Sequence, residues 1–82
     1  MKKYQCKCCG YYTLDMSPEG SYEICPVCYW EDDSVQSKDS DYTGGANIVS
    51  LNVAKTNFSS FGASDRRFIK YVRSPSLEER GI

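Results

Sequence analysis

Cysteines are the residues of this sequence whose type and spacing point most directly to chemistry. They form two groups, one at residues 6–9 and one at residues 25–28. Four of them give the pattern C-x2-C-x15-C-x2-C, which lies within the spacing of four-cysteine zinc sites. Two residues between paired cysteines allow a tight turn to direct both sulfurs at one tetrahedral Zn²⁺, about 2.3 Å away. We therefore predict one structural zinc ion with these ligands: Cys6, Cys9, Cys25 and Cys28.

The predicted site is closed, because four thiolates leave no coordination position for the water or substrate that catalytic zinc requires. Iron in the same cage stays open as an alternative, since tetrahedral sulfur also suits iron. A thiol-redox role for Cys25 and Cys28 is a further alternative, although the surrounding sequence lacks the βαβ pattern of thioredoxin-like proteins.

Cys8 is the fifth cysteine, and it occupies the position in the first group that Val27 occupies in the second. This position should point away from the metal, so we predict a small packed thiol that is not a ligand. The alternative is a free thiol that is reactive or exchanges metal. Lys7 beside it would lower the pKa of the thiol, but the negative charge of a zinc–tetrathiolate would oppose that effect.

The rest of the composition explains why a metal would be needed. The chain has 82 residues, enough for a single domain, but Leu, Ile, Val and Phe account for only 15 of them. Domains this small commonly add disulfides, a metal or a partner subunit to a sparse core. The odd number of cysteines and the lack of an apolar leader after Met1 indicate a reducing, cytoplasmic setting, where cysteine clusters more often bind metal than form disulfides.

Charge and missing residue types argue against several functions. The chain has no histidine, which removes His-dependent nucleophilic sites and the usual general base at neutral pH. Its net charge of −1 is unlike that of typical nucleic-acid-binding domains. No apolar run is long enough to span a membrane. We therefore expect a protein that is not an enzyme.

A hairpin and two helices are the elements expected to position the cysteines. Residues 11–15 and 21–24 alternate between apolar and polar types, and Ser17-Pro18-Glu19-Gly20 between them fits a type I turn. The fold class that follows is a small α+β metal-bound domain, with a zinc-ribbon or rubredoxin-like β-hairpin and two short C-terminal helices. We expect one domain over residues 1–82: a zinc-knuckle hairpin at 4–30, an acidic and Gly-rich loop at 31–49, two helices within 50–74, and a loose C-terminal tail at 75–82.

The helices are predicted from their caps and apolar spacing. Ser50 is the expected N-cap of a helix that ends at Gly62, and Ser64 is the expected N-cap of a second helix limited by Pro75. The apolar positions expected to face the core are Leu51, Ala54, Phe58 and Phe61 in the first helix, and Phe68, Tyr71 and Val72 in the second.

Two charged stretches are candidate partner-binding surfaces. Residues 31–41 carry five carboxylates and one lysine, and residues 65–73 carry a net charge of +3. Such runs are usually solvated surface. The functional interpretation is that they dock a partner protein. A third interpretation is that the two runs pair with each other. The candidate residues are Glu31, Asp32, Asp33, Arg66, Lys70 and Arg73.

Three longer motifs lie around the cysteines and after the acidic stretch. They are Cys8-Cys9-Gly10-Tyr11-Tyr12-Thr13-Leu14, the segment 22–33 with Cys25-Pro26-Val27-Cys28-Tyr29-Trp30, and Gly44-Gly45-Ala46-Asn47 through Ser50-Leu51. Together they resemble the bacterial cysteine-rich CPCC family. Lys7 stands where the name-giving motif has proline, which leaves the first turn less rigid but removes no ligand. The resemblance implies a small bacterial cytosolic protein with a shared cysteine site, and it implies no activity.

Functions from three classes remain. We favour a zinc-stabilised module that binds an unknown protein partner. The second is a nucleic-acid-binding zinc ribbon that uses Lys2, Lys3 and Lys7 with tyrosines as stacking platforms, which the nearby acidic stretch opposes. The third is a thiol-redox or metal-responsive protein that uses Cys8 or the Cys25/Cys28 pair.

Overall fold

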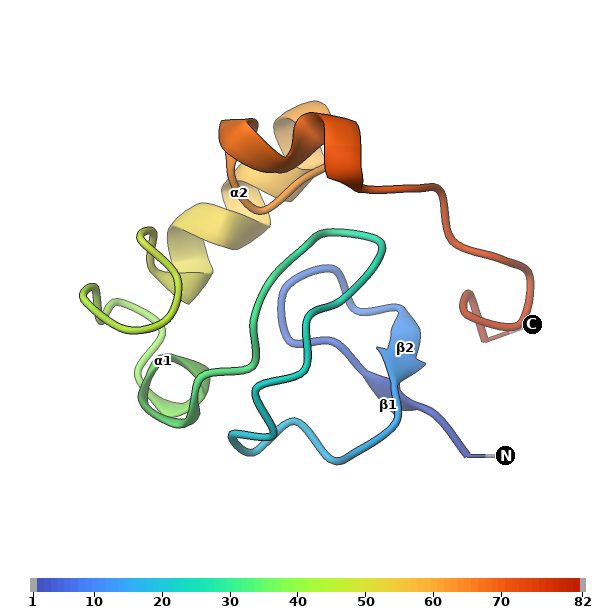
Figure 1. Cartoon of the computed structure of the whole chain (residues 1–82), viewed down its shortest axis with the longest axis horizontal. Coiled ribbons are helices and arrows are strands. Elements are labelled where there is room, and N and C mark those ends of the chain that lie inside the picture. Colours follow the sequence, from blue (N-terminus) through green and yellow to red (C-terminus); the bar gives the residue numbers. More distant parts are fainter. Residues whose placement is uncertain (1, 82) are drawn as a thin grey trace.

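The computed structural model describes residues 2–81 and shows a small α+β fold (Figure 1). Its elements, in chain order, are strand β1 (Tyr4–Gln5), strand β2 (Tyr12–Leu14), helix α1 (Ser34–Lys38), helix α2 (Leu51–Phe61) and the 3₁₀ helix η1 (Arg66–Tyr71). The small sheet and the irregular segments after it form one side of the molecule, and α2 with η1 lies across the other (Figure 1). No described helix has the length and apolar character needed to cross a membrane.

The two-stranded hairpin is present, but it is not the predicted one. β1 pairs antiparallel with β2, with Tyr4 opposite Leu14, so the hairpin encloses the first cysteine group instead of the turn at 17–20. Among the described residues, segment 21–24 makes only an isolated bridge from Ile24 to Glu31. The sheet does not extend because side chains satisfy the backbone donors: the Glu23 carboxylate accepts from the backbone N–H groups of residues 15 and 16.

Helix α2 confirms the prediction from its caps. The Ser50 hydroxyl accepts from the Val53 N–H, and Gly62 ends the helix in a left-handed conformation with φ of 82°. Leu51 and Ala54 are buried on the core-facing side. The helix therefore begins and ends where the sequence indicates.

The second helix differs from the prediction in its type and its cap. It is a 3₁₀ helix, and Asp65 is its N-cap, with a carboxylate that accepts from the Arg67 N–H and pairs with the Arg67 guanidinium. Ser64 does not cap it, because the helix begins at Arg66 and Asp65 therefore occupies the N-cap position. The Ser64 N–H donates to the Cys28 carbonyl, and its carbonyl accepts from the Asn57 side chain.

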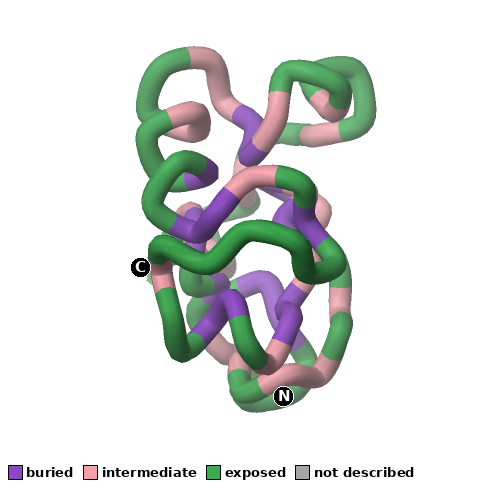
Figure 2. Tube along the Cα trace, turned by 90° about the vertical axis from the view of Figure 1, so that its left-hand side faces the viewer, coloured by how far each residue is buried: buried purple, intermediate pink, exposed green. Residues whose placement is uncertain are grey.

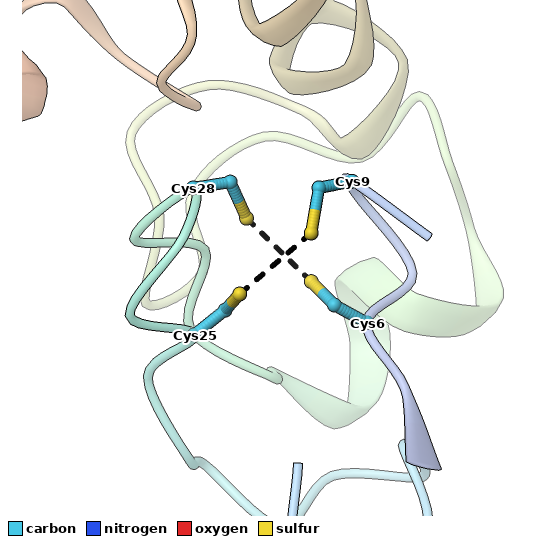
Figure 3. Close-up of side chains that lie close together, drawn as sticks. All are labelled: Cys6, Cys9, Cys25 and Cys28. Atoms are coloured by element: carbon cyan, nitrogen blue, oxygen red, sulfur yellow. Dashed lines mark hydrogen bonds between the residues drawn. The ribbon is translucent and has the colours of Figure 1, made fainter. Parts of the chain in front are cut away.

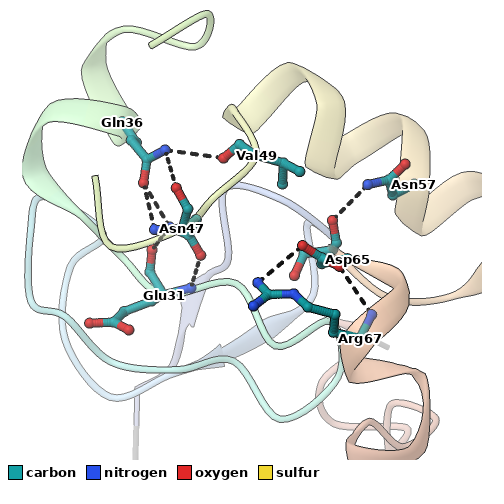
Figure 4. A network of polar contacts seen from close by, with 8 residues as sticks. Glu31, Gln36, Asn47, Val49, Asn57, Asp65 and Arg67 are labelled. Carbon is teal, nitrogen blue, oxygen red and sulfur yellow. Dashed lines mark hydrogen bonds and ion pairs between the residues drawn. The ribbon is translucent and has the colours of Figure 1, made fainter. Parts of the chain in front are cut away.

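The middle segment is more ordered than the predicted loop over 31–49. Asp33 caps α1, and the fully buried Gln36 side chain donates to the carbonyls of residues 42, 47 and 49. Gln36 Oε1 in turn accepts from the backbone and side-chain N–H groups of Asn47 (Figure 4). Gly45 is required here, because a Cβ would stand 2.7 Å from Asp33 Oδ2 and 2.8 Å from Gln36 Oε1.

The described part of the tail is also held in place, which corrects the prediction of a loose end. The Arg73 guanidinium binds both oxygens of Glu79, at 2.7 and 2.8 Å. Ser76 and Glu79 form a reciprocal capping box. The Glu79 carbonyl accepts from the Tyr12 N–H at 2.7 Å, so the turn is anchored to β2.

The core is small and is built largely from cysteines. Buried positions form short stretches separated by exposed ones (Figure 2). Trp30 is buried in this core, whereas Tyr22 is half exposed. The buried cluster comprises Cys6, Cys8, Leu14, Cys25, Val27, Cys28, Trp30, Leu51 and Ala54.

Candidate metal centre

The four predicted ligand cysteines point at one another across the centre of the cysteine half (Figure 3). The sulfurs of Cys6 and Cys28 are 3.5 Å apart, and those of Cys9 and Cys25 are 3.7 Å apart. All four sulfurs lie within 4.8 Å of one another. A tetrahedral ion with bonds of about 2.3 Å to sulfur requires sulfurs about 3.8 Å apart. The donor set and its spacing therefore fit a single tetrahedral metal ion.

The two cysteine pairs lie in separate backbone turns that have the same conformation. We call residues 6–10 the first knuckle and residues 25–29 the second knuckle. In the first, the Gly10 N–H donates to the Cys6 carbonyl at 2.9 Å; in the second, the Tyr29 N–H donates to the Cys25 carbonyl at 2.7 Å. Both knuckles end in left-handed backbone, with φ of 80° at Gly10 and 69° at Tyr29. The spacing C-x2-C thus produces two equivalent turns that face one centre.

The flanking backbone closes each knuckle in the same way. The N–H of the first cysteine in each pair donates to the carbonyl five residues later, from Cys6 to Tyr11 and from Cys25 to Trp30. The β1–β2 pairing extends the first closure, and the Ile24–Glu31 bridge extends the second. Short antiparallel contacts therefore hold both pairs of sulfurs in position.

The sulfurs alone accommodate very little negative charge. Hydrogen bonds from Cys28, Cys6 and Cys9, together with the Thr13 hydroxyl at 3.0 Å, hold the pKa of Cys25 far below its ordinary value. The hydrogen bond with Cys25 is the main cause that raises the pKa of each of the other three thiols. Contacts among the four thiols thus oppose their simultaneous ionisation, and a bound cation is needed to ionise all four.

Thr13 is a contributor that the sequence pattern did not identify. It is buried on β2 and places its hydroxyl on Cys25, so the strand of the first knuckle supports a ligand of the second. Its position in an alternating stretch gave no sign of this, because the contact joins segments that are distant in sequence.

Cys8 is buried and lies outside the group of four. It belongs to the same buried cluster as Cys6, Cys25 and Cys28. Cys8 is thus a packed thiol beside the four-sulfur group.

The predicted acidic partner surface is not formed as expected. Asp32 and Asp33 are only 1% and 6% exposed. One Asp32 oxygen accepts from the N–H groups of Gly20 and Ser21 and from the Ser21 hydroxyl, and the other accepts from Ser37. Both carboxylates serve the interior of this chain, which leaves only Glu31, partly exposed, from the acidic set.

The basic candidates lie on the outside of the helical half. Arg66, Lys70 and Arg73 are all exposed. The Arg66 guanidinium lies 4.7 Å from the centre of the Phe61 ring, and the Lys70 ammonium lies 5.8 Å from that of Tyr71. Arg73 is paired with Glu79 in the C-terminal turn and not with the acidic stretch.

These features define a small α+β domain with a four-cysteine cluster positioned to hold a metal ion. A family model described as Cysteine-rich CPCC matches residues 4–79, so the chain belongs to the cysteine-rich CPCC family. The match spans both knuckles and the helical half. No curated protein matches the chain.

Proposed function

We propose that the protein is a zinc-stabilised, non-catalytic module that binds another protein in a reducing compartment such as the cytoplasm. The observation that carries the metal part is the cluster of four converging, free cysteines in a core with few aliphatic residues. Four sulfurs fill a tetrahedral shell, so the ion would have no position for a substrate. Zinc is preferred over iron for a purely structural role, because it has no redox chemistry.

The surface supports binding more than catalysis. Two hollows among the described residues are open grooves, one lined by Lys3, Tyr12 and the 76–81 turn, the other mainly by apolar side chains. In the first, Lys3 is paired with Asp15 and Glu79 is paired with Arg73. Among the charged groups of this lining only Glu78 is outside the ion pairs of the described residues, so the groove offers no general acid facing a general base.

The nucleic-acid alternative is less supported by the arrangement of the N-terminal lysines. Lys3 is paired with Asp15, and Lys2 lies over the Tyr4 ring at 5.1 Å from its centre. The ion pair neutralises the charge of Lys3, and Lys2 covers one face of the Tyr4 ring. Single-strand binding would use free basic side chains and open aromatic faces.

Site-specific photo-crosslinking in the native cell tests the interaction role. A photoreactive residue would replace Ile69, Ile48 or Met16, which are 45%, 66% and 60% exposed on different faces. We expect a discrete protein adduct from at least one position, and its loss when Cys28→Ser is added. Absence of a discrete adduct at every position would contradict the proposed function.

A further inference from the structure

The second groove lies where the helical half meets the second knuckle. It has a volume of about 420 Å³ and is lined by Val27, Phe58, Phe61, Gly62, Val72, Arg73, Ser74 and Pro75. Five of these side chains are apolar, and no carboxylate lines the groove. An apolar groove with few polar groups is typical of a binding site.

The metal site holds the walls of this groove in place. The Arg73 N–H donates to the Pro26 carbonyl at 3.2 Å, and the Ser64 N–H donates to the Cys28 carbonyl at 2.8 Å. Val27, between the two cysteines, contributes to the lining although it is only 1% exposed. The cluster therefore positions a binding surface as well as stabilising the core.

The residues around the groove carry an excess of positive charge, which favours an occupant with a negative charge. Residues 50–75 contain five basic residues and one acidic residue, a net charge of +4, whereas the whole chain has −1. Asp65 is paired with Arg67, and Arg73 is paired with Glu79. Within the described part of the chain, Arg66 has no carboxylate partner, and its guanidinium covers the ring of the groove residue Phe61. The rim thus offers an unpaired cation next to an apolar hollow.

We propose that this groove binds a short segment of a partner protein that places a large apolar side chain in the hollow and an acidic residue beside Arg66. This inference rests on the proposed function and names the chemistry of the partner. A nucleic acid fits less well, because it carries a phosphate on every nucleotide, whereas Arg73, the one charged residue of the lining, is already paired with Glu79. A protein segment can place its carboxylate beside Arg66 alone.

Selection from a phage-displayed library of random peptides, with the full-length protein purified under reducing conditions, tests the proposal. Enriched sequences should combine Asp or Glu with one or two large apolar residues. Synthetic, fluorescein-labelled copies would then be titrated by fluorescence polarisation. Arg66→Glu should weaken their binding by about ten-fold or more, because an attractive charge becomes repulsive.

Matched variants separate the groove from general electrostatic attraction. Lys55→Glu makes the same change of charge on an exposed α2 residue outside the groove lining, and it should weaken binding by less than about three-fold. Val72→Thr adds a hydroxyl to the lining and should weaken binding, whereas Val53→Thr, 47% exposed on α2 and outside the lining, should not.

The proposal would be overturned if no peptide is enriched, or if the enriched peptides lack acidic residues. Equal binding of the peptides to the native protein and to the Arg66→Glu and Val72→Thr variants would overturn it as well. If no peptide is enriched and a single-stranded DNA oligonucleotide binds in a way that Arg66→Glu abolishes, the occupant would be a nucleic acid instead. Crosslinks from another face together with any of these results would reject the groove and keep the interaction role. If crosslinks are also absent from every position, both proposals fail.

Discussion

The two knuckles have the same backbone but are supported by different parts of the molecule. The first ends at Gly10, where left-handed backbone costs little, and apart from its chain neighbours no atom lies within 4 Å of the place that a Cβ would take. The second ends at Tyr29, whose ring packs on Phe68 at 4.7 Å and on Tyr71 at 5.7 Å between ring centres. The energetic cost of left-handed backbone at Tyr29 is thus offset by the packing of its ring on η1.

The difference indicates how a chain with a sparse core joins its two halves. The second knuckle receives hydrogen bonds from Ser64 and Arg73, and the Asp32 carboxylate follows it with contacts to segment 20–21 and α1. The first knuckle is linked to the rest mainly by Tyr11, which meets Phe58 edge-on, and by the C-terminal turn at Tyr12. The second knuckle should therefore be more important for the fold, although both supply two sulfurs.

Loss of a ligand gives the largest expected effect. Metal binding contributes on the order of 10–16 kcal/mol in zinc-finger peptides, comparable with the whole stability of about 5–15 kcal/mol of a small domain. Cys28→Ser should abolish metal binding and unfold the chain, as seen in near- and far-UV circular dichroism. Cys9→Ser, at the partly exposed position, should also lose metal but retain more residual structure. Native spectra for Cys28→Ser would show that the metal does not stabilise the fold.

Asp32→Asn should have the next largest effect. An amide cannot accept all four hydrogen bonds that the buried carboxylate accepts, so we expect a loss of about 3 kcal/mol in denaturant unfolding. Asp33→Asn is the matched control: asparagine is also a good N-cap and gives up only the acceptor for the Ala46 N–H, so it should cost less, about 1–2 kcal/mol. An Asp32→Asn variant as stable as the native protein would refute the structural role of this carboxylate.

The same carboxylate predicts a dependence of stability on pH. Burial acts to raise the pKa of Asp32, but hydrogen bonds from Ser37, Ser21 and Gly20 outweigh it and leave the pKa below the ordinary value of 3.8. Its contribution is therefore complete above about pH 4 and is lost as pH falls through the pKa of the folded state. The difference in unfolding free energy between native protein and Asp32→Asn, measured with excess metal over the pH range in which both stay folded, should shrink as the pH falls towards the lowered pKa. A difference that stays constant to the acid end of that range would contradict the lowered pKa.

Tyr29 tests the contrast between the knuckles at a smaller scale. Tyr29→Ala removes two ring contacts and keeps the strained backbone, so it should cost about 1–3 kcal/mol. Tyr29→Gly removes the same contacts but relieves the backbone, and should be about 1 kcal/mol more stable than Tyr29→Ala. Gly10→Ala should cost about 1 kcal/mol through its backbone alone. Thermal unfolding would check all three, and equal stabilities for the two Tyr29 variants would refute the offset.

Cys8→Ser is expected to have the smallest effect. Because Cys8 lies outside the four-sulfur group, the variant should keep one metal per chain and lose at most about 1 kcal/mol of stability. Metal analysis and circular dichroism check this. Loss of the metal would mean that Cys8 is a ligand in place of one of the four.

The sequence predicts local features of this fold better than contacts between distant segments. The C-x2-C spacing indicates the four converging cysteines, and Ser50 with Gly62 defines α2, because each signal lies within one turn of the chain. The hairpin between 11–15 and 21–24 does not form, since the Glu23 and Asp32 carboxylates take up backbone N–H groups that an alternating pattern assigns to a sheet.

Acidic residues show the same limit. Asp32 and Asp33 belong to an acidic run that is typical of solvated surface, yet segments 20–21 and 46 supply donors that bury them. The anchored tail depends on Tyr12, which is distant from Glu79 in sequence, and on Arg73, which lies outside the Ser76–Glu79 pattern that defines the turn. Sequence periodicity contains no information about such long-range polar partners.

A native mass spectrum of the protein, purified under reducing conditions without added metal, tests the central claim most directly. The account predicts one zinc ion per chain, with a mass that shows four thiol protons displaced. A folded, metal-free chain lighter by the mass of two or four hydrogens would instead show disulfides, and it would contradict a structural metal centre.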